Sequence, residues 1–376
     1  MKNFSNFIRP DIISMTPYTP IVPFEILSEE LGFPADEIVK LDANENPYGP
    51  SPKALEALAQ GSYYHIYPDP ESTILREKLA AHTGVPADYL LTGMGADELI
   101  DLVLRVVLSP KDKVIDSPPS FGMYPFSTQV NSGQYLTVQR NDDFSINVDG
   151  IEALVAQEPN VKIVFACSPN NPNGGVISQD DLKRLLELPV LVVLDEAYIE
   201  FAAVDGVESC IKWVEKYNNL CVLRTFSKLA ALAGLRIGYG AFPKWLLPHM
   251  MKIKQPYNIN YAADLAARAS LDDTAYLDEK VQTLVTERKK MTQLLEKFHC
   301  LKPLPSFSNF VLCEVQGRDA GIFKQRLQDE FGVLVRYYNK PGLSNFIRIS
   351  AGRPQDTEKL VAAIQHIQDT RLGALG

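Results

Sequence analysis

The sequence predicts an α/β fold with a mostly parallel central sheet, helices on both faces of that sheet, and a smaller α+β domain. From residue 50 onward, helical patterns alternate with short apolar runs, which is typical of an α/β layer architecture. Three of these runs, Val161–Cys167, Val190–Leu194 and Leu220–Leu223, are apolar nearly throughout. Such runs fit strands that are buried on both faces of a parallel sheet. After about residue 245 the pattern changes to longer helices and a few short strands, which predicts the second domain.

The expected elements divide the chain into an N-terminal arm with part of the small domain (residues 1–40), a large domain (41–260) and a C-terminal small domain (261–376). The arm is rich in proline and leads into a short helix over Pro23–Leu31. In the large domain we expect the three apolar strands, a strand at Lys113–Ile115, and helices at Pro52–Gln60, Thr73–Thr83 and Ala96–Leu108. In the small domain we expect a long helical stretch over Ala262–Lys297, strands at Asn309–Glu314, Val333–Tyr338 and Phe346–Ser350, and helices at Ile322–Phe331 and Thr357–Asp369.

Charge and composition narrow the classes of partner. The 376 residues carry a formal net charge of −9 and are 46% hydrophobic, which fits a globular protein with a sizeable core and argues against nucleic acid as a partner. No run of 18 apolar residues and no common metal-binding spacing occurs, so we expect neither a membrane span nor a metal site. Five scattered cysteines and the absence of a signal-peptide pattern predict free thiols and a cytoplasmic location, with import into an organelle left open.

One lysine stands in an unusual setting. A short strand runs into Thr225-Phe-Ser227-Lys228, and Arg236 follows between glycines in Gly-Leu-Arg-Ile-Gly. A surface lysine needs no such surroundings. A lysine that forms a Schiff base beside groups that hold a phosphate does need them.

Polar residues also follow two other apolar strands. Asp195 ends one strand and Tyr198 comes three residues later, while Asn171 stands between prolines after another strand. Ligands in open α/β sheets bind at the carboxyl ends of the strands. Each residue also has a purely structural interpretation, because a strand-end aspartate can cap a helix and an asparagine is common in turns.

A glycine-rich turn, Thr92-Gly-Met-Gly95-Ala96-Asp97, opens a predicted helix. Free backbone N–H groups at a helix start bind anions, although a plain helix start is an equally simple interpretation. The turn lacks the third glycine of the dinucleotide fingerprint, and the chain has no nucleotide-binding P-loop.

Together these segments satisfy the requirements of pyridoxal phosphate. Lys228 can bind its aldehyde, Asp195 can pair with its ring nitrogen, and Tyr198 and Asn171 can bind its ring oxygen. The phosphate of the cofactor needs cations and hydrogen-bond donors. The glycine-rich turn and the segment around Lys228 can supply them through Gly95, Ala96, Asp97, Thr225, Ser227 and Arg236.

The sequence resembles the fold-type-I pyridoxal-phosphate aminotransferases, and within them the histidinol-phosphate branch, from about Pro17 to Pro354. The resemblance rests on these motifs: LDANENPYGPSP (41–52), YPDP (67–70), GMGADE (93–98), PSFGMY (119–124), SPNNPNG (168–174), LDEAYIEF (194–201), RTFSK (224–228), LAGLRIGY (232–239), SNFVL (308–312) and IRISAG (347–352). It implies transamination between histidinol phosphate and 2-oxoglutarate in histidine biosynthesis, with residues 41–260 binding the cofactor.

The resemblance also implies residue roles. Lys228 would be the general base, Tyr124 would stack on the cofactor ring, and Tyr67 would reach the cofactor phosphate of the neighbouring subunit in an obligate homodimer. Arg348 would bind the substrate carboxylate. The remaining substrate pocket would be formed by Tyr18, Asn44, Tyr257, Asn309 and Arg336.

The sequence departs from the family pattern at three places: Ala96 for a serine, Asn173 for a threonine, and Leu229-Ala230-Ala231 for Ala-Phe-Gly. None removes a catalytic group, and the third leaves substrate choice open. The alternatives are a pyridoxal-phosphate decarboxylase of threonine phosphate and an aminotransferase for aromatic amino acids. A third is a protein that only binds or stores the cofactor, and the arginines and Tyr124 argue against it.

Overall fold

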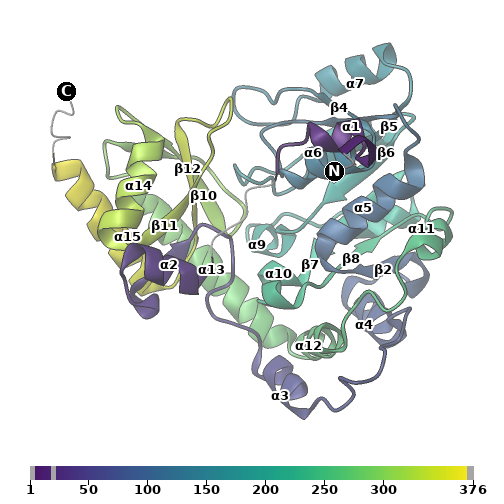
Figure 1. Cartoon of the computed structure of the whole chain (residues 1–376), viewed down its shortest axis with the longest axis horizontal. Helices are drawn as coiled ribbons and strands as arrows, with labels where there is room; N and C mark the ends of the chain where they lie inside the picture. Colours follow the sequence, from purple (N-terminus) through teal and green to yellow (C-terminus); the bar gives the residue numbers. More distant parts are fainter. Residues whose placement is uncertain (1–4, 18–22, 371–376) are drawn as a thin grey trace.

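The computed structural model describes residues 5–17 and 23–370 of the chain. Within these residues the strands form a seven-stranded sheet and a five-stranded sheet, which lie in two lobes (Figure 1). No helix among the described residues is both long enough and apolar enough to cross a membrane. All five cysteines are buried and free.

The large sheet has the strand order β2-β8-β7-β6-β5-β3-β4. Neighbouring strands are parallel except where β8 pairs antiparallel with β2 and β7. The strands are β2 (Leu90–Gly93), β3 (Lys113–Asp116), β4 (Gln134–Thr137), β5 (Val161–Cys167), β6 (Leu191–Asp195), β7 (Leu220–Thr225) and β8 (Gly238–Ala241). The predicted mostly parallel sheet is therefore confirmed.

Alternate residues of the central strands enter two separate cores. Val192 and Leu194 pack with one group of helices, whereas Leu191 and Val193 pack with another. The first core includes residues of α3 (Pro52–Gln60), α4 (Thr73–Thr83), α7 (Val148–Gln157), α8 (Gln179–Leu186), α9 (Ile199–Ala203) and α12 (Tyr261–Leu271). The second includes residues of α5 (Gly95–Val107), α6 (Met123–Val130) and α11 (Leu247–Ile253). Burial on both faces explains why these strands read as continuous apolar runs.

The small sheet has the order β1-β11-β12-β10-β9, so its edge strand comes from the start of the chain. The strands are β1 (Val39–Leu41), β9 (Leu301–Pro303), β10 (Phe310–Val315), β11 (Val333–Tyr337) and β12 (Phe346–Ser350). One face packs on α13 (Thr274–Leu295), α14 (Ala320–Phe331) and α15 (Pro354–Asp369), as the shared core of these elements shows. The other face carries Arg336 and Arg348, which are register partners.

The long helical stretch expected over residues 262–297 consists of two helices. Helix α12 ends at Leu271 and α13 begins at Thr274. Lys53 of α3 donates to the Asp272 carbonyl at 2.6 Å, and Lys78 of α4 pairs with the Asp272 carboxylate. These contacts of Lys53 and Lys78 stabilise the junction between the two helices. The spacing of apolar residues in the sequence gives no sign of where the first helix ends.

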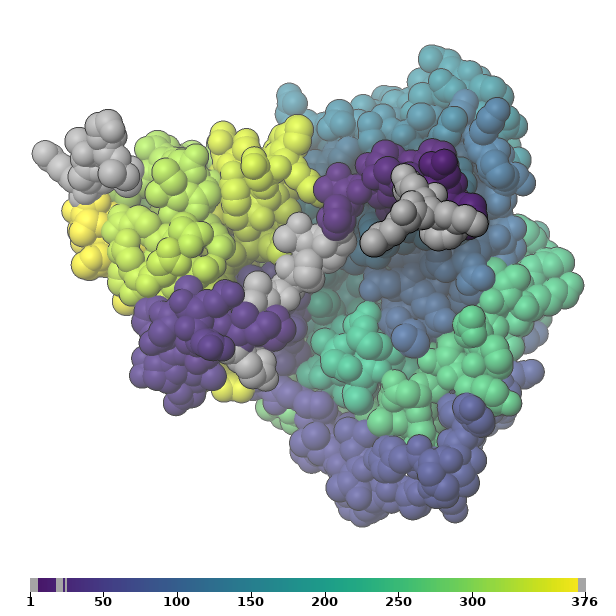
Figure 2. Space-filling model, viewed as in Figure 1, coloured from purple at the N-terminus to yellow at the C-terminus, as the bar shows by residue number. Residues whose placement is uncertain are grey.

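The arm before β1 spans both lobes. Helix α1 (Pro10–Ile13) lies near α6 of the large lobe, and Arg9 donates to the Val130 carbonyl at 2.9 Å. Helix α2 (Phe24–Leu31) lies on the small lobe (Figure 2). The domain boundaries predicted at residues 40 and 260 stay predictions, although β1 joins the small sheet as the arm's assignment requires.

Candidate active site

Lys228 lies where the chain leaves the large sheet. Strand β7 ends at Thr225, and Lys228 sits in the single turn α10 (Phe226–Leu229) that follows. The Thr225 hydroxyl accepts the N–H of Ser227 at 3.0 Å and so starts this turn. The Lys228 Nζ donates to the carbonyl of Ala43 at 3.1 Å. Burial, together with the positive charge of Arg348, lowers the pKa of Lys228 to about 8.

Asp195 is the last residue of β6. It pairs in register with Leu223, which lies two residues before the end of β7, the strand that leads to Lys228. Asp195 is 3% exposed, and burial raises the pKa of its carboxyl to about 6. The Tyr124 hydroxyl donates to its Oδ2 at 2.8 Å, and the N–H of Ala197 donates to its Oδ1 at 3.0 Å. Both hydrogen bonds favour the charged carboxylate and oppose the effect of burial.

Tyr124 does not lie where a ring-stacking residue is expected. Its side chain has no exposed surface, and its ring stacks on Phe165 at 4.5 Å with 5° between the planes. Phe121 packs edge-on against it at 5.6 Å and is partly exposed. Tyr124 therefore has no surface that a ligand could contact in this structure, whereas Phe121 does.

Three further predicted residues meet at the hydroxyl of Tyr198. The Asn44 amide donates to the Tyr198 hydroxyl at 3.1 Å, and the Asn171 amide approaches the same oxygen at 3.5 Å. Tyr198 packs edge-on against Phe310 of the small sheet at 5.2 Å. Burial raises the pKa of Tyr198 above its ordinary value, so its hydroxyl keeps its proton and can donate.

The glycine-rich turn forms the start of α5, as the sequence predicts within one residue. No side chain caps this helix at Met94, and Gly95 has a φ of 75°, a conformation that favours glycine. Arg236 lies over this turn and forms an ion pair with Asp97 at 3.2 Å. Ala96 follows in the same helical turn, and Ser227 is buried. An uncapped helix start beside a guanidinium is suited to an anion.

Arg348 joins the two lobes at the site. It is 5% exposed and donates through Nη1 to Asn171 Oδ1 at 2.7 Å and through Nη2 to the Asp42 carbonyl at 2.6 Å. Its guanidinium lies over the ring of Phe310 at 5.2 Å. Its Nε is buried without a hydrogen-bond partner. A buried donor without a partner is a group whose hydrogen bond a bound ligand can supply.

Asn309 and Asn44 form the wall behind Arg348. The Asn309 amide donates to the Asn44 carbonyl at 3.0 Å, and the Asn44 side chain accepts from Ser350 at 2.9 Å. The Asn309 Oδ1 is buried without a partner. Asn44 has a positive φ of 56°, which asparagine tolerates better than most residues.

Four more residues were predicted at the site, and the structure describes three of them. Tyr67 is 78% exposed and stacks on Tyr257 at 4.7 Å. Arg336 lies opposite Arg348 in the small sheet. Tyr18 falls outside the described residues, so its predicted place in the pocket is not addressed.

Sequence reasoning missed several groups at the site. These are the Asp42 carbonyl, Phe121, Phe310 and Tyr338, all of which contact predicted residues. Phe121 stood inside the PSFGMY motif, just before the helix that carries Tyr124, and its place in that motif could have indicated it. The others depend on contacts between distant segments, for which the sequence has no local signal.

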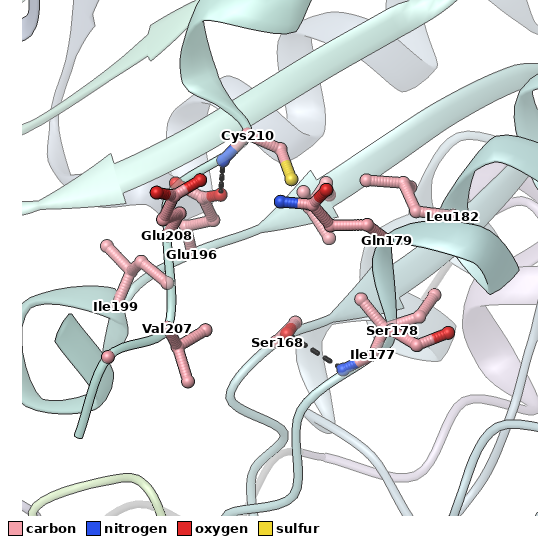
Figure 3. A pocket seen from close by; sticks show the side chains of 12 residues that line it. Ser168, Ile177, Ser178, Gln179, Leu182, Glu196, Ile199, Val207, Glu208 and Cys210 are labelled. Carbon is pink, nitrogen blue, oxygen red and sulfur yellow. Dashed lines mark hydrogen bonds between the residues drawn. The ribbon is translucent and has the colours of Figure 1, made fainter.

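A cavity of about 270 Å³ is separate from the candidate active site (Figure 3). Glu196, the neighbour of Asp195, lines it together with Cys210, Gln179 and Ser168. The Glu196 carboxylate is fully engaged, because it accepts from Arg224 Nε at 3.0 Å and from the Cys210 N–H at 2.7 Å. None of the predicted cofactor or substrate groups lines this cavity. No cluster of three or more metal-ligating side chains occurs in the part of the chain that the structure describes.

The lysine, the strand-end carboxylate and the uncapped helix start meet at the carboxyl edge of a doubly covered α/β sheet. The profile of the class I and II aminotransferases matches residues 36–364. The chain therefore belongs to the class I and II aminotransferase family.

Individual relatives are more specific. The chain is 51% identical over 361 residues to histidinol-phosphate aminotransferase 1, chloroplastic, of Arabidopsis thaliana, which covers 96% of this chain and 85% of the plant protein. It is 43% identical to the histidinol-phosphate aminotransferase of Roseiflexus castenholzii, covering 97% of this chain and 99% of that protein. The crystal structure of histidinol-phosphate aminotransferase from Sinorhizobium meliloti in complex with pyridoxal-5'-phosphate superposes with a TM-score of 0.86 at 29% identity, over 97% of this chain and 99% of that one.

Proposed function

We propose that this protein is a pyridoxal-phosphate-dependent histidinol-phosphate aminotransferase of histidine biosynthesis. It converts histidinol phosphate and 2-oxoglutarate to imidazole acetol phosphate and glutamate. The relatives at 51% and 43% identity, which are named for this activity and aligned over nearly the whole chain, support the substrate. The observation that carries the chemistry is the meeting of Lys228, Asp195 and the start of α5 at one edge of the large sheet.

The donors and acceptors of this site fit the cofactor. Bound pyridoxal phosphate supplies an electron sink for the bonds at the substrate's amino carbon. The cup for its phosphate is a helix start without a side-chain cap, with Arg236 over it. We propose that the cofactor is held by Gly95, Ala96, Asp97, Asn171, Asp195, Tyr198, Thr225, Ser227, Lys228 and Arg236, and by Tyr67 of a second subunit.

Lys228 is suited to move protons near neutral pH. Its pKa of about 8 means that the amine exchanges its proton readily at the pH of a cell compartment. A base works best when its pKa lies near the working pH. We propose that Nζ takes the proton from the substrate's amino carbon.

Asp195 holds a positive charge at the ring nitrogen in this proposal, and Tyr124 supports it. The Tyr124 hydroxyl keeps one carboxylate oxygen in a fixed direction at 2.8 Å. The stacking role that the family resemblance implies for Tyr124 is better suited to Phe121, which is partly exposed and packs against Tyr124.

The substrate side of the site is cationic. Arginine binds carboxylate and phosphate groups in the same forked geometry, so one pocket can accept glutamate and histidinol phosphate in turn. We propose that Arg348 binds both anions and that Arg336 adds charge for the phosphate. Asn44, Asn309, Tyr257 and Tyr18 complete the pocket. Because the two substrates bind alternately, the kinetics are ping-pong.

We further propose a homodimer with shared active sites. Several large apolar side chains are exposed near Tyr67, and some of them line one hollow: Tyr63, Ile66, Tyr67 and Ile74. A patch of this kind marks an interaction surface, and closed symmetric dimers are the commonest arrangement. The cytoplasmic location stays a prediction, and because the Arabidopsis relative is named as chloroplastic, fractionation of the source cells decides the compartment.

The deciding experiment incubates the purified holoenzyme with histidinol phosphate, threonine phosphate, phenylalanine or tyrosine, each with and without 2-oxoglutarate, and measures glutamate and CO2 together. The proposal expects glutamate formation that depends on 2-oxoglutarate, and no CO2. Release of CO2 from threonine phosphate without 2-oxoglutarate would assign the decarboxylase instead. A strong preference for phenylalanine or tyrosine over histidinol phosphate would assign the aromatic aminotransferase.

A further inference from the structure

Two arginines face each other in the small sheet. Strands β11 and β12 are antiparallel, and their register makes Arg336 and Arg348 direct partners. Like charges at directly opposite positions repel and destabilise the pair of strands. Neighbouring groups must therefore offset the repulsion between the two guanidinium groups and orient both side chains.

The ring of Tyr338 contacts the guanidinium groups of both Arg336 and Arg348. It is two residues beyond Arg336, so along an extended chain the two side chains leave on the same side. The Arg336 Cζ is 5.6 Å from the centre of this ring, and the Arg348 Cζ is 5.9 Å from it. Both distances lie within the range of cation–π attraction. Phe310 lies 5.2 Å from Arg348, so that guanidinium is near two aromatic rings.

The contacts of Arg348 leave it able to bind a ligand. Its Nη atoms donate to Asn171 and to the Asp42 carbonyl, while its Nε is buried without a partner. A cation–π contact acts through the positive charge of the guanidinium and needs none of its N–H groups as donors to another side chain. The ring thus positions the arginine without competing with an anion.

We propose that Tyr338 is a positioning residue that determines substrate specificity, by holding Arg336 and Arg348 together so that they bind the doubly charged end of a phosphate monoester. This inference rests on the proposed function, because it assigns the phosphate of the amino substrate to this arginine pair. A single carboxylate needs one guanidinium, whereas a phosphate dianion benefits from two. Loss of the ring therefore affects the phosphate substrate more than glutamate.

The test compares Tyr338→Leu with Tyr338→Phe and Tyr338→Trp in the holoenzyme. We expect the leucine variant to raise the KM for histidinol phosphate roughly tenfold, and that for glutamate less, with kcat nearly unchanged. The phenylalanine and tryptophan variants keep a π face and are expected to retain wild-type KM values. The matched control is Tyr89→Leu, because Tyr89 lies under Lys244 at 4.7 Å and has no place in the site.

A second measurement does not depend on turnover. Calorimetry with inorganic phosphate and with glutarate, on each variant without added substrate, reports anion binding directly. The inference expects weaker phosphate binding in Tyr338→Leu alone. Equal KM values in Tyr338→Leu and wild type, or an equal loss in Tyr338→Phe, would overturn it. If Tyr338→Leu does not fold, a raised KM in Tyr338→Trp or Tyr338→Phe overturns it, and retained values support it.

The two proposals fail in different ways. If the wild-type enzyme does not use histidinol phosphate, the proposed function fails, and the phosphate calorimetry still tests Tyr338. If the wild type uses histidinol phosphate and the leucine variant is unchanged, only the role of Tyr338 fails.

Discussion

The lowered pKa of Lys228 distinguishes it from a lysine on the protein surface. Burial and the charge of Arg348 both disfavour the protonated amine, so the pKa falls from 10.5 to about 8. The amine is therefore charged below about pH 8 and neutral above it, whereas an ordinary lysine stays charged to above pH 10. The lysine has been made a base by its position in the fold.

We predict that Lys228 of the cofactor-free protein titrates near pH 8 in a reductive-methylation NMR experiment. The signal is assigned by its absence in Lys228→Ala. Replacing Arg348 with glutamine removes a positive charge and is expected to move the midpoint to higher pH. A midpoint together with the bulk of the lysines would contradict the prediction.

The hydroxyl of Tyr124 lowers the pKa of the neighbouring Asp195 carboxyl. Its hydrogen bond favours ionised Asp195 and so opposes burial, which raises the pKa of Asp195 to about 6. The other ionisable groups that face this carboxyl are Cys167, Glu196 and Asp97, and the negative charges of Glu196 and Asp97 raise its pKa further. Without the hydroxyl, Asp195 is expected to hold its proton to a higher pH.

We therefore predict that Tyr124→Phe shifts the acid limit of cofactor affinity upward in pH, because a protonated Asp195 cannot pair with a charged ring nitrogen. Fluorescence titration of the cofactor-free protein with pyridoxal phosphate between pH 5 and 8 measures this. The control is Tyr135→Phe, which removes a similar hydroxyl from Asp116 at 2.7 Å. An unchanged limit in Tyr124→Phe would refute the role of the hydroxyl.

At the scale of elements, the start of helix α5 depends on a glycine. Gly95 has a φ of 75°, and a Cβ there would lie 2.6 Å from Nη2 of Arg236. A side chain at this position therefore meets backbone strain and also displaces the guanidinium from the anion cup. Gly342 has nearly the same φ, 77°, but open space around it.

We predict that Gly95→Ala and Gly342→Ala both lower the free energy of unfolding by about 1–2 kcal/mol, the cost of a left-handed non-glycine residue. Only Gly95→Ala is expected to weaken cofactor binding. Urea unfolding and cofactor titration separate the two effects. Equal cofactor affinity in the two variants would mean that the start of α5 does not hold the phosphate.

The elements also show how far a sequence pattern reaches. Strand β5 and helices α3 and α4 were predicted at their observed bounds, because apolar period and caps are local properties. The short strand β8 (Gly238–Ala241) was missed, since Gly-Tyr-Gly-Ala carries little strand propensity and pairs only because β2 and β7 flank it. Strand β1 likewise exists through its pairing with β11.

For the whole molecule, the exposed patch around Tyr67 makes the assembly testable. We predict that Lys228→Ala and Tyr67→Ala, each nearly inactive alone, regain about a quarter of wild-type activity when mixed after subunit exchange, because half of the dimers are mixed and each has one intact site. Sedimentation verifies that both variants remain dimers. No recovery in verified mixed dimers, or a fully active monomer, would contradict shared sites.

The sequence alone determined the chemical groups and their order: a lysine after one buried strand, a carboxylate at the end of another, and an anion-binding turn before a helix. It did so because strand period, turn residues and helix starts are properties of neighbouring residues. Only the tertiary structure decided that Tyr124 supports Asp195, that Arg336 and Arg348 share the ring of Tyr338, and that α12 ends before α13. Those outcomes depend on register and packing between segments far apart in the chain, where the surroundings of a side chain, and not its neighbours in sequence, set its direction and its pKa.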